Sequence, residues 1–136
     1  MFGKRHNKPK NRIDSLIGAE IRIDGNVSFS GGLRIDGEVN GNVIAVPGKP
    51  STLVLSEHGR INGEISVTHL MVNGVVDGPV HAAEYLELQS KAKVTGSVHY
   101  KTLEIQLGAI VDGRLIHLAD AVSDKVVALK LNSGAD

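Results

Sequence analysis

The chain has 136 residues and a mass of 14.4 kDa, with 15 basic and 15 acidic side chains, 16 glycines, four aromatic residues and no cysteine or tryptophan. This length fits one domain, and the missing cysteines exclude disulfides, thiolate metal sites and cysteine nucleophiles. No apolar stretch reaches the ~18 residues of a membrane span, and the start lacks the apolar core of a secretory signal. A cytoplasmic location is therefore expected.

Residues 1–14 are predicted to form a disordered basic arm that anchors the chain to a membrane. The first twelve residues hold five bases and no acid, whereas the other residues hold ten bases and fifteen acids. Apolar side chains at the start can enter a bilayer surface, and each nearby cation adds ~1 kcal/mol at an anionic leaflet. The predicted membrane-binding residues are Met1, Phe2, Lys4 and Arg5. A solubilising tail and a nucleic-acid arm are the alternatives, and the acidic remainder of the chain disfavours nucleic acid.

Residues 15–118 contain a repeat. Its recurring phrase is an aliphatic residue, usually Asp or Asn, then Gly, any residue and a second aliphatic, beginning at Ile23, Ile35, Val39, Ile61, Val72, Val76, Val94 and Val111. Leucines 16 to 20 residues apart mark the expected repeats, at Leu16, Leu33, Leu53, Leu70, Leu86 and Leu103. The longest interval contains residues 47–50, which are rich in proline and glycine and are predicted to form a surface loop.

The alternation of aliphatic and polar positions within each repeat is typical of β-strands. Hairpin turns at every glycine phrase would leave strands of about two residues, which excludes an antiparallel meander. The sequence therefore predicts an all-β fold, a single-domain parallel β-helix or solenoid of about six triangular coils with a length of ~29 Å. Glycine suits the bends, and ladders of inward aliphatic side chains explain the scarcity of aromatic residues. Residues 119–136 are predicted to form a flexible tail.

The two end coils are the candidate site. A parallel solenoid ends in open strand edges, which soluble proteins have to cap. No amphipathic helix lies within the predicted coils, and the short segment 122–131 is one candidate cover. Stacking of subunits end to end would satisfy the same edges. The predicted polymerisation interface comprises Leu16, Ile17, Ile21 and Ile23 at one end and Leu103, Ile105, Leu107, Ile110 and Leu115 at the other.

These features together resemble the bactofilin family of bacterial polymer-forming cytoskeletal proteins. The resemblance is carried by the repeated glycine phrases and by the segments Ser15-Leu16-Ile17-Gly18 and Leu33-Arg34-Ile35-Asp36-Gly37. The first five residues also resemble the membrane-targeting start of many members. The resemblance implies a right-handed β-helix that forms filaments without nucleotide. It further implies a cytoplasmic scaffold at the inner membrane that positions cell-wall or other morphogenetic proteins. The insertion at 47–50 and the tail after Leu118 are departures from it.

No catalytic residue, metal, cofactor or nucleotide site is predicted. His81 and His99 are expected to stack as an outward ladder without the further ligands that zinc requires. The acids that precede glycine are predicted to be turn residues, because Asn or Thr replaces them in other repeats; they are Asp24, Asp36, Asp77 and Asp112. The glycine phrases lack the helix and the Lys-Ser/Thr ending of a phosphate loop. The rival functions are a hexapeptide-repeat acyltransferase, whose strict six-residue period is absent, and a monomeric binding module.

Overall fold

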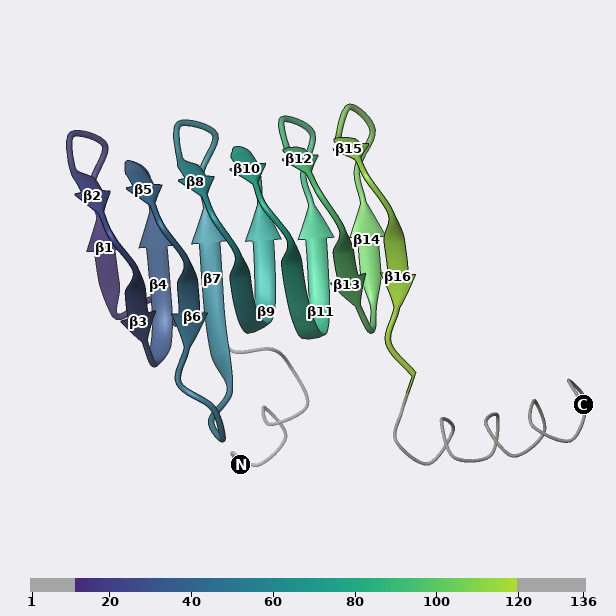
Figure 1. Cartoon of the computed structure of the whole chain (residues 1–136), viewed down its shortest axis with the longest axis horizontal. Coiled ribbons are helices and arrows are strands. Elements are labelled where there is room, and N and C mark those ends of the chain that lie inside the picture. Colours follow the sequence, from purple (N-terminus) through teal and green to yellow (C-terminus); the bar gives the residue numbers. More distant parts are fainter. Residues whose placement is uncertain (1–11, 120–136) are drawn as a thin grey trace, which may run out of the picture.

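The computed structural model of the protein describes residues 12–119, which form sixteen parallel-paired strands and no helix (Figure 1). The chain winds through six coils with three strand segments each, since two of the sixteen strands are long enough to supply two segments. This winding confirms the predicted solenoid. The first two coils comprise β1 (Ser15–Ile17), β2 (Arg22–Asp24), β3 (Val27–Phe29), β4 (Gly31–Ile35), β5 (Glu38–Asn40) and β6 (Val43–Ala45). The middle coils comprise β7 (Ser51–Leu55), β8 (Arg60–Asn62), β9 (Ile65–Val72), β10 (Val75–Asp77) and β11 (Val80–Leu88). The last strands are β12 (Lys93–Thr95), β13 (Val98–Tyr100), β14 (Leu103–Ile105), β15 (Ile110–Asp112) and β16 (Leu115–His117).

The stacked strands make three faces. Face A comprises β1, β4, β7, the second halves of β9 and β11, and β14. Face B comprises β2, β5, β8, β10, β12 and β15. Face C comprises β3, β6, the first halves of β9 and β11, β13 and β16. Because β9 and β11 run on from face C into face A, these two faces form one ten-stranded sheet, and face B is a separate six-stranded sheet.

Inward aliphatic side chains form the core as ladders along the rod. The predicted leucine ladder is confirmed for five coils, in which Leu33, Leu53, Leu70, Leu86 and Leu103 pair in succession. Leu53, Leu70 and Leu86 have no exposed surface. Removal of one such side chain from water contributes about 1.5–3 kcal/mol, so the ladder is a principal source of stability.

The predicted position of Leu16 in this ladder is wrong. Ser15 pairs with Leu33, and Leu16 pairs with Arg34 on the outside of face A. The register is set one residue earlier, where the backbone N–H of Asp14 donates to the carbonyl of Gly32 and the Asp14 carboxylate accepts from the Gly32 N–H. Since successive side chains of a strand point to opposite faces, this shift turns Leu16 outward and Ile17 inward.

The turns that join face A to face B are of two lengths. Four-residue turns close this corner in the first, third, fifth and sixth coils, and they form the loops above β2, β8, β12 and β15 (Figure 1). The second and fourth coils turn at Gly37 and Gly74 instead. A Cβ on Gly74 would lie 2.3 Å from the Ser56 carbonyl oxygen and 2.5 Å from that of Gly59, so only glycine fits under the longer turn. The phrases beginning at Ile35 and Val72 therefore form a different corner from the other six.

Glycine also lines the corner between faces B and C, as predicted for the bends. A Cβ on Gly63 would lie 2.2 Å from the Gly41 carbonyl oxygen of the coil beneath, and the same close approach recurs at Gly41, Gly78 and Gly113. Residues 47–50 form an exposed turn between the second and third coils, which confirms the predicted surface loop.

Candidate polymerisation surfaces

The C-terminal end of the rod consists of β14, β15 and β16, each with one edge that no described strand pairs. Ile105 and Leu115 point inward, in register with Leu88 and Val98 of the coil beneath. Leu88 and Val98 are fully buried, whereas Ile105 is 47% and Leu115 is 45% exposed. The difference arises because no described coil follows the sixth. This end therefore presents unpaired backbone groups beside open aliphatic ladders, the combination predicted for an assembly surface.

The other predicted residues of the sixth coil differ in direction. Leu103 points inward and is half-buried. Leu107 lies in the A–B turn and is 96% exposed, and Ile110 is in register with Lys93 on the outside of face B. The structure thus brings Leu103, Ile105 and Leu115 together at the end of the core and places Leu107 and Ile110 at its rim.

The inward apolar side chains of the N-terminal end are less exposed than Ile105 and Leu115 at the other end. Ile17 points inward and is 9% exposed, and Ile23 is half-buried on face B. Leu16 lies on the outside of face A, and Ile21 lies in the first A–B turn. The predicted set for this end missed Val27 and Phe29 of β3, which pack against the core. Their alternation with Ser28 is the signal in the sequence that identifies them as inward.

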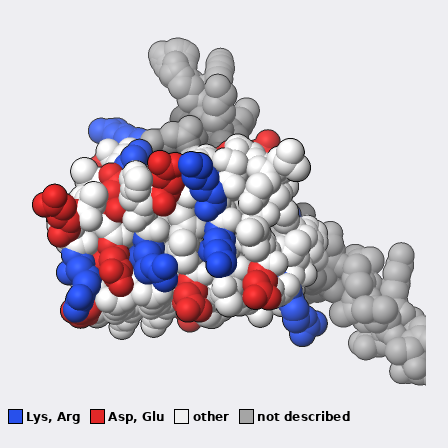
Figure 2. All heavy atoms as spheres, turned by 90° about the horizontal axis from the view of Figure 1, so that it is seen from above, with Lys and Arg blue, Asp and Glu red and all other residues white. Residues whose placement is uncertain are grey.

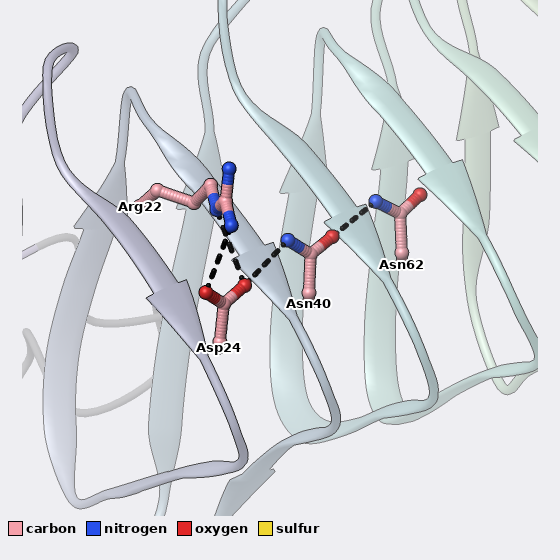
Figure 3. Close-up of polar contacts among 4 residues, drawn as sticks. All are labelled: Arg22, Asp24, Asn40 and Asn62. Atoms are coloured by element: carbon pink, nitrogen blue, oxygen red, sulfur yellow. Dashed lines mark hydrogen bonds and ion pairs between the residues drawn. The ribbon is translucent and has the colours of Figure 1, made fainter.

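A polar ladder ends at the N-terminal rim of face B (Figure 3). Arg22 donates to both carboxylate oxygens of Asp24, at 3.2 and 3.0 Å. Asn40 donates to Asp24 at 2.9 Å, and Asn62 donates to Asn40 at 2.6 Å. The hydrogen bonds from Arg22 and then Asn40 hold the pKa of Asp24 below its ordinary value. The Asp24 carboxylate thus acts as a hydrogen-bond acceptor for Arg22 and Asn40 at the end of β2, and it is not arranged as a proton donor.

Face B carries interspersed charges of both signs. Figure 2 views the rod from above, the side on which Figure 1 draws face B, and shows Lys and Arg side chains intermixed with Asp and Glu. Arg22, Glu38 and Arg60 follow one another in register along this face. Face B therefore differs in chemistry from the aliphatic C-terminal end of the core.

The histidines and the remaining acids form local contacts. His81 and His99 stack with ring centroids 4.1 Å apart, as predicted, and the Nε2 atom of His81 lies 3.8 Å from a Glu64 oxygen. His117 instead packs edge-on against Tyr100. Within residues 12–119 no three His, Cys, Asp or Glu side chains are grouped as metal ligands.

A tyrosine network lies on face A near the C-terminal end. The Tyr85 hydroxyl donates to the carboxylates of Glu104 and Glu87, and the Gln106 amide donates to Glu87. The hydrogen bond to Glu104, together with burial, raises the pKa of Tyr85, so the phenol holds its proton. The network joins the fifth and sixth coils, and nothing in the sequence pattern pointed to it.

Two predicted segments lie outside the described residues. They are the membrane-binding set Met1, Phe2, Lys4 and Arg5, and the candidate cover 122–131. Of the predicted arm and tail, the structure describes only residues 12–14 and Ala119. Between residues 12 and 119, no helix is long and apolar enough to cross a bilayer.

Comparison with known proteins identifies this architecture. The family model named Bactofilin, described as polymer-forming cytoskeletal, matches residues 15–116, which covers the six coils. The chain belongs to the bactofilin family. Two curated bactofilins of Myxococcus xanthus (strain DK1622) are similar to it. Bactofilin BacP is 26% identical over 112 residues, which cover 82% of this chain and 45% of BacP. Bactofilin BacO is 26% identical over 102 residues, which cover 75% of this chain and 78% of BacO.

The chain spans less than half the length of BacP and over three quarters of BacO. No solved structure matches it significantly. The bactofilin family is described by its polymers and not by a reaction, which agrees with the structural role that the repeat favours over an acyltransferase.

Proposed function

We propose that this bactofilin is a cytoskeletal scaffold whose subunits stack end to end into filaments. The observation that carries the proposal is the open C-terminal coil, where Ile105 and Leu115 continue buried ladders and yet are nearly half exposed. A second subunit placed there supplies what the next coil would supply: partners for the strand edges and cover for the aliphatic side chains. Membership of a polymer-forming family supports this assignment.

The energetics of such a contact favour assembly without a nucleotide. Burial of apolar surface contributes roughly 25 cal/mol per Å², and the unpaired N–H and C=O groups of three strand edges gain hydrogen-bond partners. Strand edges and aliphatic side chains need no bound ligand to associate. A contact that joins opposite ends does not close on itself, so repetition of it yields a filament.

The basic arm, residues 1–14, is proposed to attach the filament to the membrane. Met1 and Phe2 are proposed to enter the inner face of the cytoplasmic membrane while Lys4 and Arg5 attract anionic lipid headgroups. Each arm alone is a weak anchor, and a filament multiplies it by avidity. In this proposal residues 1–14 bind the membrane and residues 15–118 polymerise. The sides of the rod recruit cell-wall or morphogenetic proteins.

The test of the proposed interface is Leu115→Arg, compared with Val75→Arg. Leu115 is 45% exposed at the end of the core, so an arginine there is expected to charge the contact without unfolding the coil. Val75 is half-buried and points outward in the middle of face B, away from both ends. Negative-stain electron microscopy should show filaments for the wild type and Val75→Arg and single rods for Leu115→Arg.

Circular dichroism checks that both variants keep the β-fold. Wild-type filaments from a folded Leu115→Arg protein would show that the C-terminal coil is not the contact. Loss of filaments in both variants would move the contact to the side of the rod.

A further inference from the structure

One row of outward side chains runs the whole length of face A. Since the strands of this face pair in register, this face A row continues from the first coil to the sixth as Leu16, Arg34, Val54, Met71, Glu87 and Glu104. The entering residues 12 and 13 cross the face at Gly32, and the Arg34 side chain nearby keeps 48% of its surface exposed. The row is thus basic in the second coil, apolar in the two middle coils and acidic in the last two.

The charges of the face A row are only partly balanced within the subunit. The Nε atom of Arg34 donates to Asp36 at 2.8 Å, and the two terminal guanidinium nitrogens have no partner in residues 12–119. Glu87 and Glu104 accept hydrogen bonds from the neutral Tyr85 hydroxyl, and Glu87 also accepts from two glutamine amides. Neither carboxylate lies within 4.0 Å of a Lys or Arg nitrogen of the described chain. The C-terminal half of the row therefore presents two carboxylates without a cation.

Antiparallel pairing of two copies through face A brings the unlike parts of the row together. A two-fold axis at right angles to the face reverses the order of the coils, so the second coil of one copy meets the fifth coil of the other. Arg34 then lies opposite Glu87 of the second copy, and Val54 lies opposite Met71. Each of these contacts occurs twice, as an isologous interface requires. Pairing of two copies in the same direction would instead place like charges opposite each other, which is unfavourable.

We propose that face A binds face A of a second copy running in the opposite direction, so that two filaments associate along their lengths. Six strands ~4.8 Å apart, each contributing ~16 Å of its length, cover roughly 450 Å² per subunit. A standard interface buries about 800 Å² on each partner, so a single pair of subunits is held weakly. Stacked subunits repeat the contact and multiply it by avidity. The inference rests on the proposed end-to-end assembly for this multiplication.

Reversal of the charges tests the pairing. Arg34→Glu should separate paired filaments into single ones, because Glu87 of the second copy then faces another acid. Glu87→Arg should do the same, whereas the two substitutions in one chain exchange the charges and should restore the pairs. Arg60→Glu makes the same charge change at an exposed position of face B and is the matched control.

Negative-stain electron microscopy counts paired and single filaments, and circular dichroism checks that each variant keeps its β-fold. The paired fraction should fall about tenfold in each single variant, since the contact is lost twice per interface. It should return to the wild-type value in the double variant and remain there in Arg60→Glu.

A thiol crosslinker reports the same contact independently. The chain contains no cysteine, so Met71→Cys introduces a single thiol close to the proposed two-fold axis. Copies of this residue in stacked subunits of one filament are ~29 Å apart, beyond the reach of a short bis-maleimide, so covalent dimers report the lateral contact. Val75→Cys, which is half-buried and points outward on face B, should give about tenfold less dimer.

Equal dimer yields from Met71→Cys and Val75→Cys would overturn the pairing. A folded double charge variant that forms only single filaments would also overturn it, and the two carboxylates would then be assigned to a basic partner of another kind.

The pairing and the end-to-end assembly fail in different ways. If Met71→Cys gives the expected excess of dimers but no filaments form, the pairing stands and the end-to-end contact falls. If the wild type forms single filaments and Met71→Cys gives no excess of dimers, the end-to-end contact stands and the pairing falls.

Discussion

Gly74 shows how one residue fixes the winding of the chain. Its backbone passes beneath the four-residue turn of the third coil, where two carbonyl oxygens occupy the space of a side chain. Gly18 is also at the A–B corner, but no atom lies within 4 Å of a Cβ built on it. A side chain is therefore excluded at Gly74 and has room at Gly18, although both glycines lie at the same corner.

Gly74→Ala is expected to destabilise the protein by ~1–3 kcal/mol, because the obstacles are backbone oxygens that cannot move alone. Gly18→Ala should change the free energy of unfolding by no more than about 0.5 kcal/mol. Urea denaturation of both variants below the assembly concentration measures the difference. Equal midpoints would show that the third coil shifts to accommodate the methyl group.

At the scale of elements, each coil packs only against its neighbours. Leu70 in the fourth coil has a leucine above and below it and no exposed surface. Leu103 occupies the same ladder position in the sixth coil and has a described neighbour on one side only. The stability of such a stack is approximately a sum over coils and their contacts.

Leu70→Ala should therefore lower the free energy of unfolding by about 2–5 kcal/mol, the range for a fully buried leucine. Leu103→Ala should cost about half as much, because its side chain already meets solvent at the end of the rod. Thermal and urea unfolding of the unassembled proteins provide the comparison. A larger loss for Leu103→Ala would show that the end of the core is covered in solution.

At the scale of the whole molecule, the rod separates its surfaces by chemistry. Face B carries charges of both signs, the C-terminal end is aliphatic, and the five bases of the first twelve residues precede the N-terminal end. Assembly and membrane binding are then expected to be separable, because the residues proposed to bind the membrane precede the six coils in the sequence.

Deletion of residues 2–5 tests this separation. The shortened protein should still form filaments, since the six coils are unchanged, and should no longer co-sediment with anionic liposomes. Neutral liposomes serve as the control for the wild type, which should bind them more weakly. Undiminished co-sedimentation of the shortened protein would place the lipid contact on the rod.

Much of the fold could be predicted from the sequence, because the ladder from Leu33 to Leu103 repeats in one dimension. Leu16 could not be placed, since its register depends on backbone hydrogen bonds between Asp14 and Gly32. Nor could the two kinds of corner be separated, because the same local phrase forms both. The count of repeats was enough to predict which residues form the two end coils. It could not predict that Ile17 is less exposed than Ile105, because exposure depends on packing in three dimensions.

The exposed loop at residues 47–50 has a consequence for any filament built in this way. It lies at the corner between faces C and A, where no other described segment forms such a loop, so every subunit carries this feature once. The pitch of the coils fixes the mean spacing of these loops at ~29 Å along the filament. Proteins that recognise the loop would be spaced at multiples of the subunit length, so the filament would set the distances between them.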